Sequence, residues 1–201
     1  GIPSLDRATL GMRPGELIVV AGRPGMGKTT GALHFALSAS VANGAVGFFS
    51  LEMNDVELAE RQLAALAYQP RAQEEISYRA IAEGRNLSDA ALRRLYDAEY
   101  ACRKVPLWIE QQAGLTVSQI VTRSRQMKLR AERAGMPLAA IMVDHIGLVR
   151  PSRRYAGNRV QEISEITGAL KGLAKDLDVP VLGLSQLSRA VEQREDKRPQ
   201  L

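Results

Sequence analysis

The sequence predicts an α/β protein with a mainly parallel sheet covered by helices on both faces, and three observations lead to this prediction. Short, continuous apolar stretches of strand length alternate with longer segments of helical periodicity. Continuous apolar strands are typical of parallel sheets that are buried on both faces. A glycine-rich loop joins the first predicted strand to the first long helix. The polar residues best suited to chemistry follow predicted strands, at the edge where such sheets bind ligands.

The first strand, loop and helix contain the most specific local pattern. Residues 16–21 are apolar and β-branched and predict a buried strand, and residues 30–42 predict a helix that ends near Asn43 and Gly44. Between them, residues 22–29 read Gly-Arg-Pro-Gly-Met-Gly-Lys-Thr and match the phosphate-binding pattern G-x-x-x-x-G-K-[ST]. Strand, loop and helix in this order are the context that the pattern requires, so we expect a nucleotide site here.

The residue types in this loop suit a phosphate chain and its metal ion. Glycines let the backbone wrap the phosphates, and backbone N–H groups together with the helix dipole supply a fixed positive potential. We expect Lys28 to reach the β- and γ-phosphates and the Thr29 hydroxyl to hold Mg²⁺. The predicted nucleotide-binding residues are Gly22, Arg23, Pro24, Gly25, Met26, Gly27, Lys28, Thr29 and Thr30.

The remaining elements continue the alternation. Strands are predicted at residues 45–50, 106–110, 138–144 and 180–185, and helices at residues 55–68, 74–82, 89–102, 116–134 and 160–177. Thr116 and Gln119 predict a capping box, and Leu115 and Ile120 a hydrophobic staple. The last helix is predicted from an apolar stripe at helical spacing, formed by Val160, Ile163, Ile166, Leu170, Leu173 and Leu177.

The composition of the 201-residue chain places it among globular proteins. Hydrophobic residues make up 45% and aromatic residues 4%, which favours neither a fibrous, a disordered nor a membrane class, and the apolar runs are of strand length. The single cysteine, Cys102, excludes an internal disulfide and predicts a cytoplasmic location. The chain begins with Gly1 and lacks an initiator methionine, so we expect residues 1–201 to be one domain of a longer protein.

The net charge of +5 is modest, but the basic residues gather in three clusters. They comprise Arg123, Arg125, Lys128, Arg130 and Arg133; Arg150, Arg153, Arg154 and Arg159; and Arg189, Arg194, Lys197 and Arg198. The first is spaced like the solvated side of a helix. The second and third fall in predicted loops after strands, where they could meet a polyanion. Charge alone leaves nucleic-acid binding open.

Three polar residues at strand ends are candidates for phosphoanhydride chemistry. Asp144 ends an apolar strand and suits the carboxylate that completes Mg²⁺ coordination. Glu52 could orient or deprotonate a water that attacks the γ-phosphate, or could simply favour a helix N-terminus. Gln186 could hydrogen-bond the γ-phosphate, or could be an ordinary surface glutamine. Position alone does not decide between these alternatives.

Taken together, the motifs resemble the C-terminal motor domain of the DnaB-type replicative helicases, which has a RecA-like P-loop NTPase core. The strings that carry the resemblance are residues 1–6 (Gly-Ile-Pro-Ser-Leu-Asp), 15–17 (Gly-Glu-Leu), 21–29 (Ala-Gly-Arg-Pro-Gly-Met-Gly-Lys-Thr), 49–53 (Phe-Ser-Leu-Glu-Met), 143–144 (Val-Asp), 162–166 (Glu-Ile-Ser-Glu-Ile), 173–175 (Leu-Ala-Lys), 184–189 (Leu-Ser-Gln-Leu-Ser-Arg) and 192–199. They cover nearly the whole chain. Residues 21–29 and 50–53 are far more specific than the generic phosphate-loop pattern.

The resemblance implies an ATP-dependent helicase that moves 5′ to 3′ on single-stranded DNA. It implies that Glu52 is the catalytic base, that Asp144 and Thr29 hold Mg²⁺, and that Gln186 senses the γ-phosphate. It also implies a homo-hexamer in which residues 150–158 and the segment after Gln186 line a central DNA channel. Arg150, Arg153, Arg154 and Arg159 are the DNA-binding candidates. Primase and a helicase loader are the implied protein partners.

The chain departs from the family pattern in two places. The family usually has Asp-Tyr-Leu-Gln after the fourth strand, whereas this chain has Asp-His-Ile-Gly at residues 144–147, which leaves the channel loop and a chromosomal, phage or plasmid origin open. Residues 1–201 also do not include the family's N-terminal domain, its second DNA loop or the arginine that completes a neighbour's ATP site. We therefore expect residues 1–201 alone to bind nucleotide but to hydrolyse it poorly.

Two other function classes share this core. A RecA/RadA-type recombinase would form filaments and exchange strands, and the strings at residues 21–27 and 184–189 favour the helicase over it. A RecA-like nucleotide switch would bind ATP and a protein partner without moving along DNA. The complete set of Glu52, Asp144 and Gln186 argues against a switch.

Overall fold

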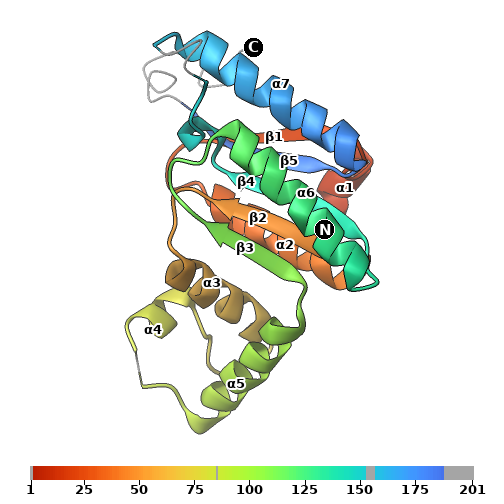
Figure 1. The fold of residues 1–201 in the computed structure, drawn as a ribbon. Helices are drawn as coiled ribbons and strands as arrows, with labels where there is room; N and C mark the ends of the chain where they lie inside the picture. Colours follow the sequence, from red (N-terminus) through yellow and green to blue (C-terminus); the bar gives the residue numbers. More distant parts are fainter. Residues whose placement is uncertain (1, 85, 153–156, 188–201) are drawn as a thin grey trace.

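The computed structural model describes residues 2–84, 86–152 and 157–187, which contain one five-stranded sheet (Figure 1). The strands are β1 (Leu17–Gly22), β2 (Ala45–Ser50), β3 (Leu107–Gln111), β4 (Leu138–Asp144) and β5 (Val181–Gln186). Their order is β1-β5-β4-β2-β3, and every neighbouring pair is parallel. The predicted parallel α/β fold is confirmed.

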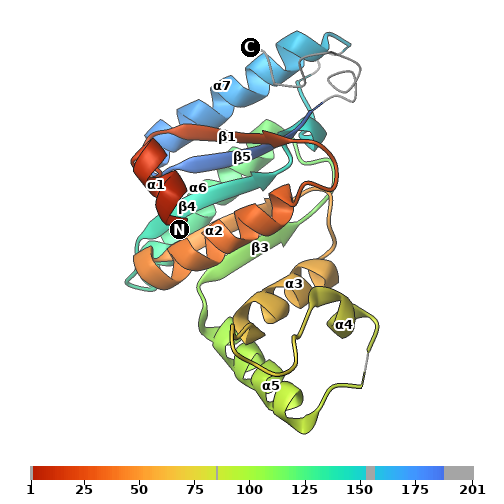
Figure 2. The ribbon, with the colours of Figure 1, turned by 180° about the vertical axis from the view of Figure 1, so that it is seen from behind.

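Helices lie on both faces of this sheet and to one side of it (Figure 1). They are α1 (Pro3–Thr9), α2 (Lys28–Asn43), α3 (Asp55–Ala67), α4 (Tyr78–Ala82), α5 (Asp89–Lys104), α6 (Val117–Arg133), α7 (Arg159–Leu177) and the 3₁₀ turn η1 (Ile146–Leu148). Helices α6 and α7 lie on one face, and α2 lies on the other, as Figures 1 and 2 show from opposite sides. None of the described helices is long and apolar enough to cross a membrane.

The central strands serve two cores at once. All six residues of β2 are buried. Alternate side chains point to opposite faces of a strand, so Phe49 packs with the α6 and α7 residues while Phe48 packs with α2. A Cβ on Gly47 would lie 2.5 Å from the Met127 sulfur, which shows how closely α6 approaches β2. Burial on both faces explains why these strands are continuous apolar runs rather than alternating ones.

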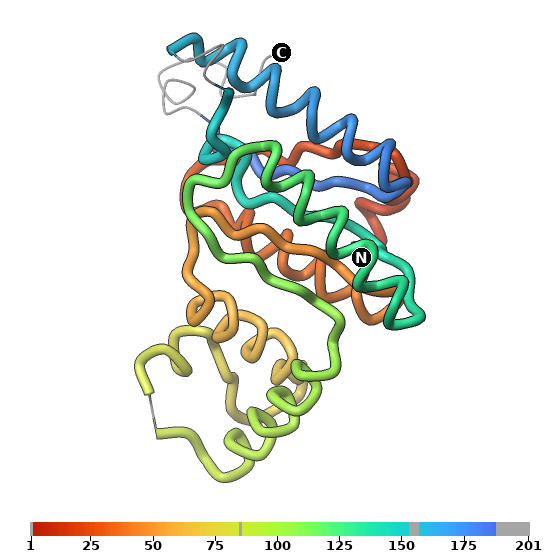
Figure 3. The backbone as a smooth tube through the Cα atoms, in the orientation of Figure 1, coloured from red at the N-terminus to blue at the C-terminus, as the bar shows by residue number. Residues whose placement is uncertain are grey.

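Helices α3, α4 and α5 follow β2 and precede β3 in the chain, and they form a separate small group outside the sheet (Figure 1). The backbone tube leaves the sheet after β2, passes through the three helices and returns as β3 (Figure 3). They have their own apolar cluster, in which Ala67, Ile76, Ala91 and Ala98 are buried. The short helix predicted at residues 74–82 is only the turn Tyr78–Ala82, because the Ser77 hydroxyl accepts a hydrogen bond from the Ala80 N–H and begins the helix there.

Local signals correctly predicted the start of α6, whereas the prediction of the apolar stripe of α7 was wrong at one residue. The Thr116 and Gln119 capping box is present, and Leu115 and Ile120 are both buried in the same core. Val160, predicted as part of the α7 stripe, is 80% exposed. At about 100° per residue, Val160 points well away from the direction shared by Ile166 and Leu170. The helix begins before its buried stripe does.

The basic residues of α6 do more than face solvent. Arg123 forms an ion pair with Glu110 of β3 at 2.8 Å, and Arg125 forms one with Asp176 of α7 at 2.8 Å. Lys128 donates to the Leu177 carbonyl, and the Arg130 guanidinium lies over the Trp108 ring. The prediction of a merely solvated face was therefore incomplete, because the long side chains reach neighbouring elements that the sequence spacing does not reveal.

Candidate nucleotide-binding site

The parallel register brings the predicted site residues to one edge of the sheet. Gly22 pairs with Gln186 across β1 and β5, and Ser50 pairs with Asp144 across β2 and β4. These are the carboxyl ends of four strands, which is where open α/β sheets bind ligands. Residues far apart in the sequence therefore meet around a single pocket of about 260 Å³, lined by Pro24, Gly25, Gly27, Lys28, Thr29, Thr30, Glu52, Met53, Arg61 and Gln186.

The loop between β1 and α2 is shaped by glycines at positions that require them. Gly25 and Gly27 have φ values of 74° and 76°, which L side chains rarely adopt. Gly27 is also the N-cap of α2 and carries no side chain to cap the first N–H groups of the helix. Such groups are ready donors for phosphate oxygens. The Lys28 ammonium donates to the Arg23 carbonyl at 2.8 Å, so the loop holds its own lysine at the pocket.

Asp144 is the buried carboxylate of the site. Asp144 is only 1% exposed, and this burial raises the pKa of its carboxyl group. The nearby Glu52 carboxylate raises that pKa further. A hydrogen bond from Thr29 and the nearby His145 and Lys28 act in the opposite direction. Within the described part of the chain, its Oδ2 atom has no hydrogen-bond partner. A buried, orphaned carboxylate oxygen beside a threonine hydroxyl fits a divalent cation, held directly or through water.

Glu52 lies on the neighbouring strand end but in a different environment. Its side chain is 55% exposed and borders the pocket, and one carboxylate oxygen lies 3.8 Å from Nε2 of His145. The turn that carries it is fixed by backbone contacts. The Ser50 hydroxyl donates to the Met53 carbonyl at 2.8 Å, and the Leu51 N–H donates to the Asp144 carbonyl at 2.7 Å. The arrangement can hold a carboxylate over a bound phosphate chain without burying it.

Gln186 closes the site from β5, and Arg61 was missed from the sequence. Gln186 borders the pocket, and the next residue donates its N–H to the Gly22 carbonyl at 3.1 Å. Arg61 of α3 donates to the Thr30 hydroxyl at 3.3 Å, and its guanidinium lies 4.3 Å from the Tyr78 ring centre. Its buried Nε has no partner among the described residues. No local pattern marks Arg61, since it is one charged residue on an amphipathic helix.

The predicted DNA-binding residues are only partly described. Arg150 is exposed, and its backbone N–H donates to the Leu115 carbonyl at 2.9 Å. Arg159 is the first residue of α7 and contacts both the Gly147 carbonyl and Glu162. Arg153 and Arg154 lie outside the described residues, as do all four members of the third basic cluster. Arg159 therefore contacts the segment that follows β4, close in sequence to the buried carboxylate of the pocket.

Comparison with known proteins places the whole chain in one family. The model of the DnaB-like helicase C-terminal domain matches residues 1–201. The chain is 39% identical to the replicative DNA helicase DnaB of Haemophilus influenzae over 201 residues, which is 99% of this chain and 40% of that protein. It is 38% identical to the replicative DNA helicase DnaC of Bacillus subtilis over 202 residues, which is 100% of this chain and 42% of that protein. The chain thus spans about two fifths of these relatives.

Solved structures agree with this placement. A DnaB-like replicative helicase, described with its interactions with primase, superposes with a TM-score of 0.86 at 34% identity, over 100% of this chain and 46% of that one. A second solved structure, described as an ATPase domain, also gives 0.86, at 33% identity, over 100% of this chain and 67% of that one. Because the family model matches the whole chain and the relatives are 38–39% identical over it, the chain belongs to the DnaB-like helicase C-terminal domain family.

Proposed function

We propose that this chain is the motor domain of an ATP-dependent replicative DNA helicase, with ATP and Mg²⁺ as its substrate and cofactor. The observation that carries the proposal is that Lys28, Thr29 and Glu52 line one pocket at the carboxyl edge of the sheet. The buried Asp144 carboxylate lies behind this lining, hydrogen-bonded to Thr29. A phosphate cradle, a metal carboxylate and a candidate base are the parts that nucleotide hydrolysis needs. The family membership supports the coupling of this chemistry to DNA.

Each residue has a distinct task in this proposal. The backbone of residues 22–27 and the Lys28 ammonium hold the phosphate chain, and Thr29 with Asp144 holds Mg²⁺. When bound, Mg²⁺ neutralises phosphate charge. Glu52 accepts a proton from the water that attacks the γ-phosphorus, while the bond to the bridging oxygen of ADP breaks. Gln186 hydrogen-bonds the γ-phosphate until it leaves, so the end of β5 responds to hydrolysis.

The partners follow from the same proposal. We place single-stranded DNA beside Arg150, Arg153, Arg154 and Arg159, held mainly through its phosphates. A homo-hexamer would set this surface around a central channel and supply a neighbour's residues to each ATP site. Primase and a helicase loader are the proposed protein partners, and one similar structure was described together with primase. We propose a cytoplasmic location for the protein.

Strand displacement tests the proposal directly. The protein in its full natural length would be mixed with ATP, Mg²⁺ and forked duplexes that carry either a 5′ or a 3′ single-stranded tail. We expect displacement that requires the 5′ tail and is lost in Glu52→Gln. ATP hydrolysis without displacement would contradict a helicase and point to a recombinase, which a strand-exchange assay detects. Nucleotide binding without hydrolysis would point to a switch.

A further inference from the structure

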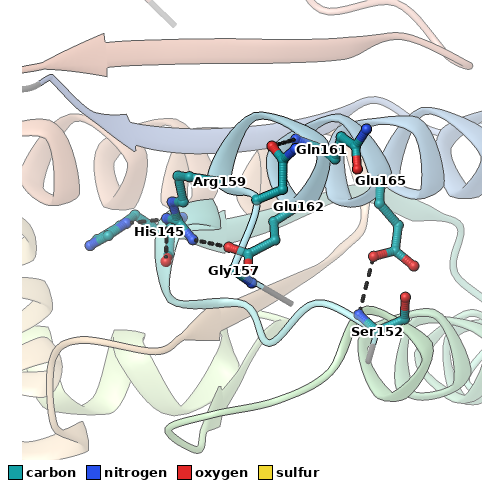
Figure 4. Close-up of polar contacts among 9 residues, drawn as sticks. His145, Ser152, Gly157, Arg159, Gln161, Glu162 and Glu165 are labelled. Atoms are coloured by element: carbon teal, nitrogen blue, oxygen red, sulfur yellow. Dashed lines mark hydrogen bonds and ion pairs between the residues drawn. The ribbon is translucent and has the colours of Figure 1, made fainter. Parts of the chain in front are cut away.

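His145 lies 3.8 Å from Glu52 of the nucleotide pocket and accepts a hydrogen bond from Gly147, whose carbonyl contacts Arg159. We propose that His145 is a positioning residue that links Glu52 to Arg159, so that a DNA phosphate at Arg159 changes the placement of the catalytic carboxylate. This inference rests on the proposed function and names a route between its two sites. It begins at Glu52, passes through His145 and Gly147, and ends at the carboxylates of α7. Figure 4 shows the part of this route from His145 to α7.

The two ring nitrogens of His145 face different partners. Nδ1 accepts a hydrogen bond from the Gly147 N–H at 3.1 Å, and Nε2 lies 3.8 Å from a Glu52 carboxylate oxygen. A neutral imidazole has one acceptor and one donor nitrogen. Because Nδ1 is the acceptor, the proton of a neutral His145 lies on Nε2, which faces Glu52. The ring thus joins the Gly147 backbone to the carboxylate.

Gly147 connects the ring to Arg159. The Gly147 carbonyl accepts a hydrogen bond from Nη2 of Arg159 at 2.8 Å, while its N–H donates to His145. Nη1 of the same guanidinium lies 3.3 Å from Glu162. One peptide segment therefore touches His145 on one side and Arg159 on the other. Figure 4 shows the Arg159 side chain between His145 and Glu162.

Two carboxylates of α7 hold the loop backbone. Glu162 accepts from the Gly157 N–H at 3.0 Å, and Glu165 accepts from the Ser152 N–H at 3.1 Å. Glu162 is thus shared between the loop backbone and the Arg159 guanidinium. An anion that draws Arg159 away breaks its ion pair with Glu162 and its hydrogen bond to the Gly147 carbonyl. The loop proposed to meet DNA is in this way tied to the residue that holds Gly147.

The centre of this route is closely packed, which lets a displacement pass along it. A Cβ on Gly147 would lie 2.9 Å from the His145 ring, so backbone and ring are already in contact. Ile146 is 3% exposed, and a Cβ on Gly183 of β5 would lie 2.9 Å from it. The His145 side chain itself is only 12% exposed. Packed groups of this kind move together rather than independently.

A DNA phosphate is the ligand expected to act on this route. The Arg159 side chain is 58% exposed, and a phosphate offers a guanidinium a second charged partner in competition with Glu162. Recruitment of Arg159 would release the Gly147 carbonyl and let the His145 ring shift relative to Glu52. Exposed charged contacts are individually weak, so we expect effects of about three- to tenfold.

The test measures ATP hydrolysis by the full natural protein with and without saturating oligodeoxythymidylate. Its readout is the ratio of the two kcat values, together with the KM for ATP. His145→Asn keeps a polar atom near the position of Nδ1, which contacts Gly147, but removes the Nε2 group that faces Glu52. His145→Gln keeps a polar group near the position of Nε2 but alters the contact with Gly147. Arg159→Lys keeps the charge without the two-pronged contact. Arg125→Lys is the matched control, because Arg125 is equally exposed at 58% and is paired with Asp176.

We expect His145→Asn and Arg159→Lys each to lower the stimulation ratio about three- to tenfold, with the KM for ATP changed less than about twofold. The double variant should have a stimulation ratio no lower than that of the more impaired single variant, since both substitutions act on one route. Arg125→Lys should keep the wild-type ratio. Full stimulation in His145→Asn and His145→Gln, or additive losses in the double variant, would overturn the proposal.

Failure of the proposed function gives a different result. In that case the wild-type protein would show no stimulation by DNA, or Glu52→Gln would hydrolyse ATP at the wild-type rate, before any His145 variant is considered. A fold defect is also distinguishable, because it would weaken ADP binding along with hydrolysis. Arg159→Lys lies at an exposed position and probes the route from its other end even if both His145 variants unfold.

Discussion

The ends of β4 and β2 carry two carboxylates in contrasting environments. Asp144 is 1% exposed, has a raised pKa and keeps one oxygen without a partner among the described residues, whereas the Glu52 side chain is 55% exposed. The strands are neighbours, and Ser50 pairs directly with Asp144. A few residues of turn after β2 are thus enough to place one carboxylate in the core and the other at the surface, which are the surroundings that the proposed metal-holding and proton-accepting roles require. Surroundings, more than residue type, assign their roles.

The largest effect is expected from a change to the exposed carboxylate, Glu52. Glu52→Gln should lower kcat for ATP hydrolysis by about 10²–10⁴-fold, because the amide cannot accept a proton from water. ADP affinity should change less than about twofold. Steady-state kinetics and ADP titration check this. Glu57→Gln, in the first turn of α3, is the control for a helix-dipole role, and equal kinetics in the two variants would contradict a catalytic Glu52.

The second prediction concerns the buried carboxylate, Asp144. Asp144→Asn should lower Mg²⁺-dependent hydrolysis by about 10²-fold, because the amide is a poorer ligand for a hard cation. In nucleotide-free protein it should raise the free energy of unfolding by on the order of 1 kcal/mol, since a buried ion is removed. Urea unfolding in the presence of EDTA measures the stability. A less stable Asp144→Asn would contradict the view that burial opposes the charge of Asp144.

The same variant has a pH dependence with a definite sign. Because the pKa of Asp144 is raised on folding, the native state binds its proton more tightly than the unfolded state. The Asp144 contribution to stability therefore falls as the pH rises through the window between its ordinary value of 3.8 and its raised value. The stability advantage of Asp144→Asn should be largest above this window and should shrink below it. Urea unfolding repeated over a pH series measures the trend.

A smaller effect is expected across the pocket, at the end of β5. Gln186→Asn shortens the amide by one methylene and should lower kcat about tenfold, because a hydrogen bond that strengthens in the transition state is lost. The KM for ATP should change less than about threefold. Single-turnover hydrolysis separates this from product release. Gln161→Asn, in the first turn of α7, is a matched control on a residue outside the pocket and should leave hydrolysis unchanged.

The smallest effect concerns Arg61, which lines the pocket together with Glu52. Arg61→Lys should raise the KM for ATP about threefold with kcat within about twofold, because lysine cannot both lie over Tyr78 and reach Thr30. Initial rates over a range of ATP concentrations measure this. Arg79→Lys, an exposed arginine on α4 paired with Glu83, is the control. A fall in kcat alone would mean that Arg61 acts on chemistry rather than on binding.

Much of the fold and of the pocket could be predicted because the signals are local. The phosphate loop needs glycines where φ is positive, and the capping box needs Thr116 and Gln119 three residues apart, so both can be recognised in a short window. Asp144 and Gln186 end apolar strands, and parallel strands end at one edge. The main residues of the site could therefore be predicted to lie together from their positions at strand ends, without knowledge of any tertiary contact.

Residues whose roles depend on distant neighbours could not be predicted in the same way. Arg123 and Arg125 look alike on α6, yet one reaches β3 and the other α7. Arg61 reaches the pocket only because α3 folds back beside α2. The exposure of Val160 depends on where α7 begins relative to the sheet. Spacing along a helix gives the direction of a side chain but not the surface that it meets.

The parallel α/β core, the phosphate loop and the family of the chain could be inferred from residue type and spacing, because their signals lie within short windows. The burial of Asp144, the exposure of Glu52, the place of Arg61 in the pocket and the position of His145 between Glu52 and Gly147 became visible in the folded structure alone. Burial, charge pairing and pKa depend on every element packed around a group. Those elements come from parts of the chain that only folding brings together.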